Sequence, residues 1–146
     1  AWLIISLLMG VSLLLHLVNI GAIGDGNLYY TAAVKSMLQS WGNFFFAAAE
    51  PGGSVTVDKP PLGLWIEALS ASIFGVNGFA VSLPNILAGV FSIPVLFHLV
   101  KKYFGSLAGI TSGAVYVITP IVLAADRNNT IDGMLVFTLL LADIFL

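Results

Sequence analysis

An acid and a base stand side by side at Asp58-Lys59, directly before the double proline Pro60-Pro61. A lysine ammonium is a compact charge that suits a phosphate group, and a carboxylate beside it can orient a hydroxyl or hold a cation. The two prolines restrict the backbone next to these charges. We therefore favour a phosphate-binding site here over the alternative, a solvated loop that leads into a helix.

A second polar group occupies the segment 126–132. Arg127 could neutralise a phosphate leaving group, because a guanidinium forms paired hydrogen bonds with phosphate oxygens. The alternative is an ordinary polar turn in which Asn129 or Thr130 caps the following helix. The residues themselves support both interpretations equally.

Other ionisable residues have simpler interpretations. Asp25, between two glycines, could act as a general base, although a turn before a helix explains the same residues on composition alone. Glu67 falls on a short expected helix, where we expect it to be solvated and without a chemical role. His16 and His98 are interpreted as packing or interface residues rather than as metal ligands.

The composition is that of a membrane protein. Hydrophobic residues make up 59% of the 146 positions and charged residues 8%, and the mean hydropathy is +1.04. Soluble domains carry about 25% charged residues. A net charge of −2 excludes a basic nucleic-acid-binding surface, and the lack of cysteine excludes disulfides and thiolate catalysis.

The apolar segments predict an all-α integral membrane protein with about four transmembrane helices. A helix that crosses a bilayer needs about 20 mainly apolar residues. Four segments meet or approach that length, the fourth being interrupted by the end of the sequence: 2–23, 79–100, 106–125 and 133–146. We interpret 1–146 as the N-terminal part of a longer polytopic protein and expect this part to be inactive alone.

Residues 24–78 form a long loop with two expected interfacial helices, at about 28–41 and 61–74. Asn27 can cap the first helix. Pro60-Pro61 can open the second, because proline fits the first helical turn. The second helix is too short to span a bilayer, so we expect it to lie at the membrane surface.

The adjacent cations Lys101-Lys102 set the expected orientation. The positive-inside rule places them in the cytoplasm. Counting helices backward and forward from them puts the loop 24–78 and the turn 126–132 on the outer side. Both polar groups are therefore expected on one non-cytoplasmic face.

Three motifs in this order resemble the family 39 glycosyltransferases, which include protein O-mannosyltransferases and the aminoarabinose transferases that modify lipid A. The motifs are Asp58-Lys59-Pro60-Pro61-Leu62-Gly63-Leu64-Trp65, Phe79-Ala80-Val81-Ser82-Leu83-Pro84 and Arg127-Asn128-Asn129-Thr130-Ile131-Asp132. The segment 29–46 is most similar to an uncharacterised bacterial branch of the family. The resemblance covers essentially the whole chain.

The resemblance implies a GT-C fold, a polytopic helical bundle with its active site on the non-cytoplasmic face of the bacterial plasma membrane. It implies an inverting transfer of a hexose or pentose from a polyprenyl-phosphate donor to a hydroxyl of a lipid, glycan or protein acceptor. Membrane lipids are then the expected surroundings, and nucleic acid is not an expected partner. The resemblance specifies no cofactor, and the need for a divalent cation, which assists some members, stays open.

By analogy with the family, Lys59 would bind the donor phosphate, Asp58 would help to form the cavity, and Asp132 matches a second acidic element of the family. Arg127 and Tyr30 are the further candidates for substrate binding. The catalytic candidates are Asp25, as the base, and Asp58. The sequence departs from the family in one respect, because the acidic pair usually found before the first outer helix is absent. Asp25 is the nearest acid to that position.

Two rival functions differ in class. A transporter or flippase would bind a lipid phosphate without chemistry, and its site would lie near the bilayer midplane, commonly between internal repeats. We find no repeat, and the charges cluster toward one face. A structural membrane subunit would leave the Asp58-Lys59 pair unexplained, so we favour the glycosyltransferase.

Overall fold

The structure, a computed structural model, describes residues 1–145, and its regular elements are all helical apart from one isolated antiparallel bridge between Ala48 and Thr56. The helices in chain order are α1 (Trp2–Leu17), the 3-10 helix η1 (Ile20–Ile23), α2 (Leu28–Met37), α3 (Trp41–Phe45), α4 (Pro61–Phe74), α5 (Gly78–Ile118), α6 (Pro120–Arg127) and α7 (Asp132–Ile144). The predicted all-helical class is confirmed.

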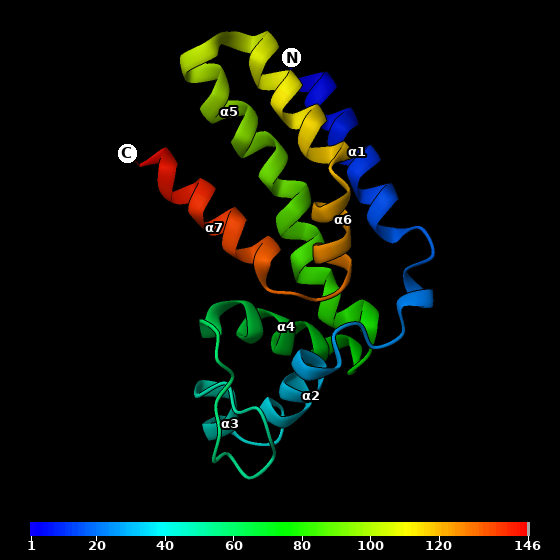
Figure 1. The fold of residues 1–146 in the computed structure, drawn as a ribbon, viewed down its shortest axis with the longest axis vertical. Coiled ribbons are helices and arrows are strands. Elements are labelled where there is room, and N and C mark those ends of the chain that lie inside the picture. Colours follow the sequence, from blue (N-terminus) through cyan, green and yellow to red (C-terminus); the bar gives the residue numbers. More distant parts are fainter. Residues whose placement is uncertain (146) are drawn as a thin grey trace.

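The helices form two parts (Figure 1). The first part is an elongated bundle of α1, α5, α6 and α7, and α2, α3 and α4 gather at one end of it. α5 folds back on itself at Gly105, whose φ of 84° lies in the left-handed region that favours glycine. Both arms of α5 therefore run within the bundle.

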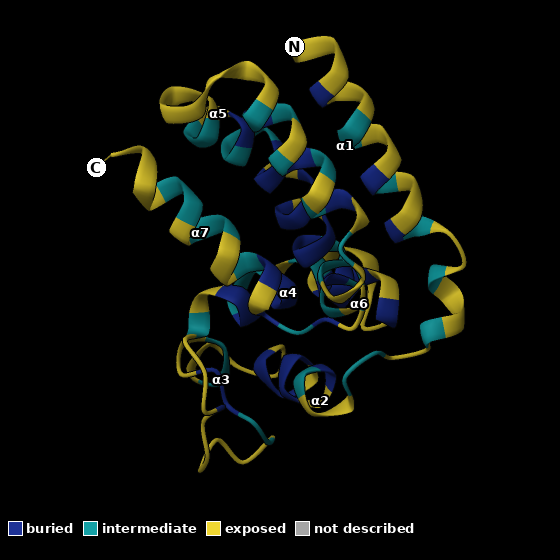
Figure 2. Cartoon of the chain, turned by 45° about the horizontal axis from the view of Figure 1, so that its top comes forward, coloured by how far each residue is buried: buried dark blue, intermediate teal, exposed yellow. Residues whose placement is uncertain are grey.

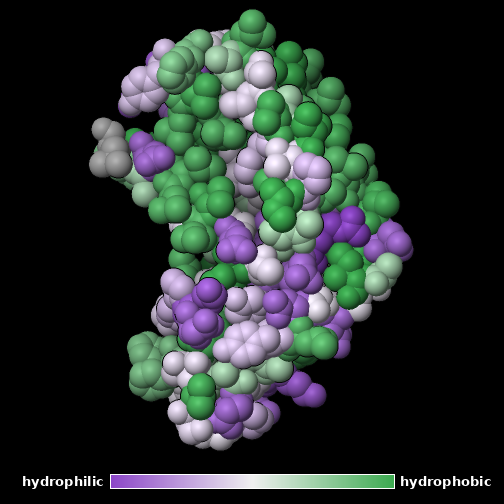
Figure 3. Space-filling view, viewed as in Figure 1, coloured by the Kyte–Doolittle hydropathy of each residue, from purple (hydrophilic) through white to green (hydrophobic). Residues whose placement is uncertain are grey.

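The bundle exposes apolar side chains, whereas hydrophilic ones gather near the end where α2 to α4 lie (Figure 3). Within residues 1–145, one helix, the 41-residue α5, is long and apolar enough to cross a membrane by length and composition. The four separate spans predicted from the sequence are not confirmed. α1 ends at Leu17, before the left-handed backbone of Asn19, and so is shorter than the first expected span. The last part of the third expected span is a separate helix, α6, that starts at Pro120.

The first loop helix begins where the sequence predicts and ends earlier. The Asn27 side chain accepts hydrogen bonds from the backbone N–H groups of Tyr29 and Tyr30, which confirms it as the cap of α2. The helix does not continue to residue 41. Ser40 is extended and caps a new helix, α3, by accepting the N–H of Asn43.

α4 spans Pro61–Phe74, as predicted, with proline in its first turn. One face of α4 packs on α2 through Leu64 and Ala68, which join the buried cluster that includes Val34 and Met37. Figure 2 shows buried residues along α2, α4 and the first arm of α5, and mostly exposed or half-buried ones on α1 and α7. The larger buried cluster therefore joins α2 and α4 with Val81 of α5, and a smaller one joins α1 to α5.

Candidate functional site

Three of the predicted site residues, Asp58, Lys59 and Asp132, line one cavity of about 410 Å³ between the start of α4 and the start of α7. Figure 3 shows a hollow in the surface between these two helices. Its remaining lining comes from α4, α7 and the residue directly before each helix: Pro60, Leu62, Gly63, Ile131, Met134, Leu135 and Thr138. Two segments that are far apart in the chain, 58–63 and 131–138, thus form one site.

The cavity has one charged side and one apolar side. Asp58, Lys59 and Asp132 are exposed, so water can solvate their charges until a ligand replaces it. Along α7 the wall is formed by Met134 and Leu135. Such a lining suits an amphiphile with an anionic or hydroxylated head and a hydrocarbon tail.

The close approach of α4 to the turn before α7 depends on Gly63. A Cβ at this position would lie 2.9 Å from the Cβ of Ile131, closer than packed carbon atoms come. Pro61 fixes the start of α4, so the preceding Asp58-Lys59 pair is held at the cavity. Asp132 is in the first turn of α7, where the helix dipole favours a carboxylate.

Tyr30, the fourth residue predicted for substrate binding, lies near this cavity. The pKa of its half-buried phenol is raised by burial first and then by the negative charges of Asp58 and Asp132. Tyr30 is therefore within electrostatic range of both carboxylates but is not part of the cavity lining. Its hydroxyl is therefore available as a neutral hydrogen-bonding group beside the charged side of the cavity.

The other two predicted site residues are not in the cavity lining. The Arg127 guanidinium donates hydrogen bonds to the carbonyl oxygens of Leu15 (3.1 Å) and Val18 (2.8 Å), at the carboxyl end of α1. The Asp25 side chain is exposed, and its backbone carbonyl accepts the Thr31 hydroxyl at 2.6 Å. Arg127 thus links α6 to the carboxyl end of α1.

The alternative in which Asn129 or Thr130 caps the following helix does not hold, because α7 follows Ile131 without a side-chain cap. Asn129 is instead fully buried and left-handed, with φ of 44°. Its side chain accepts the backbone N–H of Asn27 (2.7 Å) and donates to the Thr31 hydroxyl (3.2 Å). It therefore ties the turn before α7 to the start of α2.

The expectation that Glu67 is solvated is also wrong. Its side chain is completely buried between helices, and the Asn85 amide donates to Oε1 at 2.7 Å. Burial raises the pKa of Glu67 to about 8, while the nearby side-chain amides of Asn85 and Asn129 act in the opposite direction. A glutamate and an asparagine within apolar helices were the available signal, because such groups seldom occur there without a partner.

A second buried pair joins α1 to α6. His16 Nε2 lies 3.3 Å from Asp126 Oδ2, and His16 Nδ1 donates to the Ser12 carbonyl at 2.7 Å. A Cβ at Gly89 or at Gly133 would collide with the Asp126 carboxyl, so both glycines make room for it. The sequence interpretation of His16 as a packing residue missed this partner 110 positions away.

The arrangement of acidic and histidine side chains bears on metal binding. Within the part of the chain that the structure describes, no three His, Asp or Glu side chains are grouped so that they could hold a metal ion. Asp58 and Asp132 line the same cavity and could contribute two carboxylates to a cation that a substrate phosphate also binds.

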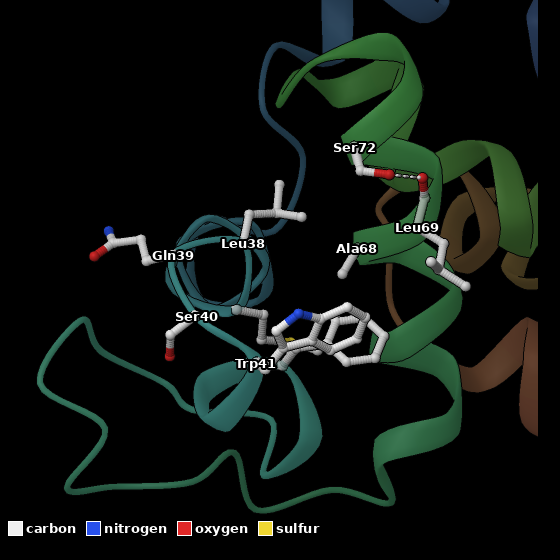
Figure 4. Close-up of a pocket in the computed structure, with 9 residues that line it drawn as sticks. Leu38, Gln39, Ser40, Trp41, Ala68, Leu69 and Ser72 are labelled. Atoms are coloured by element: carbon white, nitrogen blue, oxygen red, sulfur yellow. Dashed lines mark hydrogen bonds between the residues drawn. The ribbon is translucent and has the colours of Figure 1, made fainter.

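A separate groove of about 360 Å³ lies between the end of α2, α3 and α4. In Figure 4, Leu38 and Ala68 face one another across it, Trp41 lies along it, and Gln39 points away. Its lining contains no charged residue, so it offers no acid, base or phosphate-binding group. The cavity beside α7 is the better candidate for chemistry.

Comparison with known proteins shows the family of the chain. A family model described as dolichyl-phosphate-mannose-protein mannosyltransferase matches residues 58–146. The chain is 54% identical over 79% of its length to "Putative mannosyltransferase YycA" and 45% identical over 95% to "Putative mannosyltransferase YkcB", both of Bacillus subtilis (strain 168). It is 33% identical over 53% of its length to an uncharacterized protein of Aquifex aeolicus (strain VF5).

These matches confirm the resemblance drawn from the sequence motifs. The chain spans 17% and 19% of the lengths of the two Bacillus proteins. No solved structure matches it significantly. The matched segment begins at Asp58, so it contains both the Asp58-Lys59 pair and Asp132.

Proposed function

Because this chain belongs to the dolichyl-phosphate-mannose-protein mannosyltransferase family, we propose that the whole protein transfers a sugar from a polyprenyl-phosphate donor to an acceptor hydroxyl. The observation that carries the proposal is the cavity that brings Lys59 together with Asp58 and Asp132 beside an apolar wall. A donor of this class has a phosphate, a sugar and a hydrocarbon chain. The charged side suits the first two, and the wall of α7 suits the third.

In the proposed reaction, the bond between the anomeric carbon and the donor phosphate oxygen breaks as the acceptor oxygen bonds to that carbon from the opposite face. The configuration at the carbon therefore inverts. The phosphate leaves with an additional negative charge, which the Lys59 ammonium stabilises. The acceptor hydroxyl loses its proton to a carboxylate base.

Three carboxylates are candidates for the base. The sequence favours Asp25 through its position before the first loop helix, whereas the cavity favours Asp58 or Asp132 because both line it together with Lys59. The neutral Tyr30 hydroxyl is suited to hydrogen-bond the sugar or the phosphate. Arg127 would reach the donor only if it released the carbonyl oxygens of α1.

The proposed setting is the outer face of a bacterial plasma membrane. The apolar surface of the bundle suits lipid, and the polar end with α2 to α4 suits the aqueous interface. Lys101 and Lys102 are exposed at the turn of α5, and the positive-inside rule assigns that turn to the cytoplasm. The cavity would then open on the non-cytoplasmic side.

The test uses the full-length protein in liposomes, a panel of radiolabelled polyprenyl-phosphate sugars and membrane acceptors. Wild type is compared with Asp25→Asn, Asp58→Asn and Asp132→Asn. Transfer by wild type that one of these variants abolishes establishes the enzyme and identifies its base. Specific donor binding without transfer from any sugar in the panel would contradict the proposal and indicate a transporter.

A further inference from the structure

One amide joins three helices behind the cavity. The Nδ2 group of Asn85, on α5, donates to Glu67 Oε1 on α4 at 2.7 Å, and Asn85 Oδ1 accepts the backbone N–H of Met134 on α7 at 3.2 Å. Glu67 and Asn85 are 0% and 1% exposed. We call this set of contacts the Glu67–Asn85 junction.

The junction lies next to the cavity on both sides. Met134 lines the cavity and follows Asp132 by two residues, so the bond to Asn85 fixes the first turn of α7. On α4, Gly63 lines the cavity and lies one helical turn before Glu67. The charged side and the apolar wall are thus connected through the junction.

The surroundings of Glu67 favour its neutral form. Its Oε2 has no hydrogen-bond partner among the described residues, and neither a lysine nor an arginine stabilises a charge on it. The groups that face it are the amides of Asn85 and Asn129 and, from α2, the Tyr30 phenol, which also feels Asp58 and Asp132. An ionised Glu67 would therefore be a buried charge without a counter-charge.

We propose that Glu67 and Asn85 are positioning residues of the sugar-transfer site: protonated Glu67 holds α4 and α7 at the spacing that the cavity requires, and ionised Glu67 releases them. The activity part of this inference rests on the proposed function, and the spacing part does not. Glutamine at position 67 should preserve the spacing, because it keeps the acceptor for Asn85 and has no charge to bury. Alanine should lose the spacing.

The first test measures the distance between α4 and α7 directly. Spin labels are placed on the exposed positions Ile73→Cys and Leu139→Cys of the full-length protein, after any cysteine outside residues 1–146 is replaced. Distances are recorded at about pH 6.5 and about pH 9.5, on either side of the pKa of about 8. Glu50→Gln, a change at a half-buried glutamate in the loop before α4 that hydrogen-bonds only within its own turn, is the matched control.

We expect wild type and Glu50→Gln to gain a second distance population at the higher pH, and Glu67→Gln to show one population at both. Glu67→Ala, if it folds, should show both distance populations at both pH values. An unchanged wild-type distribution between the two pH values would overturn the inference. A Glu67→Gln protein that shows the second distance population at high pH, as wild type does, would also overturn it.

The second test separates positioning from a purely structural role. Above pH 8, wild-type sugar transfer should fall about tenfold per pH unit beyond the profile of Glu67→Gln, because only the neutral acid holds the cavity. Identical alkaline profiles would overturn the positioning role. If no sugar is transferred at all, the proposed function fails, while the distance measurement still decides the inference about the junction.

Discussion

The cavity and the junction behind it hold chemically similar carboxyl groups in opposite settings. Asp58 and Asp132 are exposed beside Lys59, whereas Glu67 is completely buried beside Asn85. Water solvates an exposed carboxylate at little cost, but a buried one must find a partner or stay neutral. The first setting leaves charge available for a ligand, and the second uses polar groups to fix the positions of helices.

The His16–Asp126 pair belongs with the junction in this comparison. Both members are buried, and together they join α1 to α6, as Asn85 joins α4, α5 and α7. Substitutions in the buried groups should therefore affect folding first. Substitutions in the cavity should affect sugar transfer and leave folding nearly unchanged.

The largest effect on stability is expected from His16→Leu. It leaves the Asp126 carboxyl buried without its partner, and breaking a buried pair in this way costs about 3–5 kcal/mol. Denaturant unfolding of the full-length protein in detergent measures the change. The control is His98→Leu at an exposed histidine of α5, and the double variant His16→Leu, Asp126→Leu should regain much of the loss. A single variant as stable as the control would show that the pair does not hold α1.

The pH dependence of stability provides the second comparison. Burial raises the pKa of Glu67 from 4.5 to about 8, so the folded protein keeps a proton that the unfolded chain loses in this interval. The free energy of unfolding should therefore fall as pH rises from about 4.5 to about 8, by on the order of 3 to 5 kcal/mol, and this contribution should be constant above.

Glu67→Gln should remove this pH dependence of the unfolding free energy, and Glu50→Gln should not. Thermal unfolding across a pH series measures all three proteins. Parallel profiles for wild type and Glu67→Gln would mean that the buried carboxyl does not titrate in this range.

Asn129→Gly should have an intermediate effect of about 2 kcal/mol, because the backbone N–H of Asn27 and the Thr31 hydroxyl lose their bonds to the side chain. Glycine is chosen because it tolerates the left-handed backbone at this position. Asn128→Gly, at the exposed neighbour, is the control. Equal unfolding free energies for the two variants would contradict the assigned role of Asn129.

Asp58→Asn should have the smallest effect on stability, no more than about 0.5 kcal/mol, because the side chain is exposed at the cavity. The same variant is expected to impair transfer. Chemical denaturation and the transfer assay, run on one preparation, separate the two effects. A large loss of stability would place Asp58 with the buried groups and weaken the contrast between cavity and junction.

The sequence predicted those elements whose signals are local. Pro61 marks the start of α4, and Asn27 caps α2, because proline and asparagine act within one helical turn of themselves. The end of α2 was predicted too late, since Ser40 begins a new cap that an apolar pattern does not reveal.

The family motifs predict that Asp58, Lys59 and Asp132 belong to one site, and in the structure these three residues line one cavity. The burial of Glu67 depends on Asn85, which lies 18 residues away on another helix, and no pattern around Glu67 specifies that partner. The bond between His16 and Asp126 crosses 110 residues. Long-range packing decides whether a carboxyl group is exposed or buried, and this part of the site could not be predicted from local sequence.

The most direct test of the proposed cavity is sugar transfer by full-length Lys59→Ala, beside Lys35→Ala as a control at an exposed lysine of α2. If the Lys59 ammonium stabilises the phosphate leaving group, its loss should slow transfer about a hundredfold to a thousandfold without changing the unfolding free energy. The control should transfer at the wild-type rate. A Lys59→Ala protein with wild-type turnover would contradict the assignment of this cavity as the site of sugar transfer.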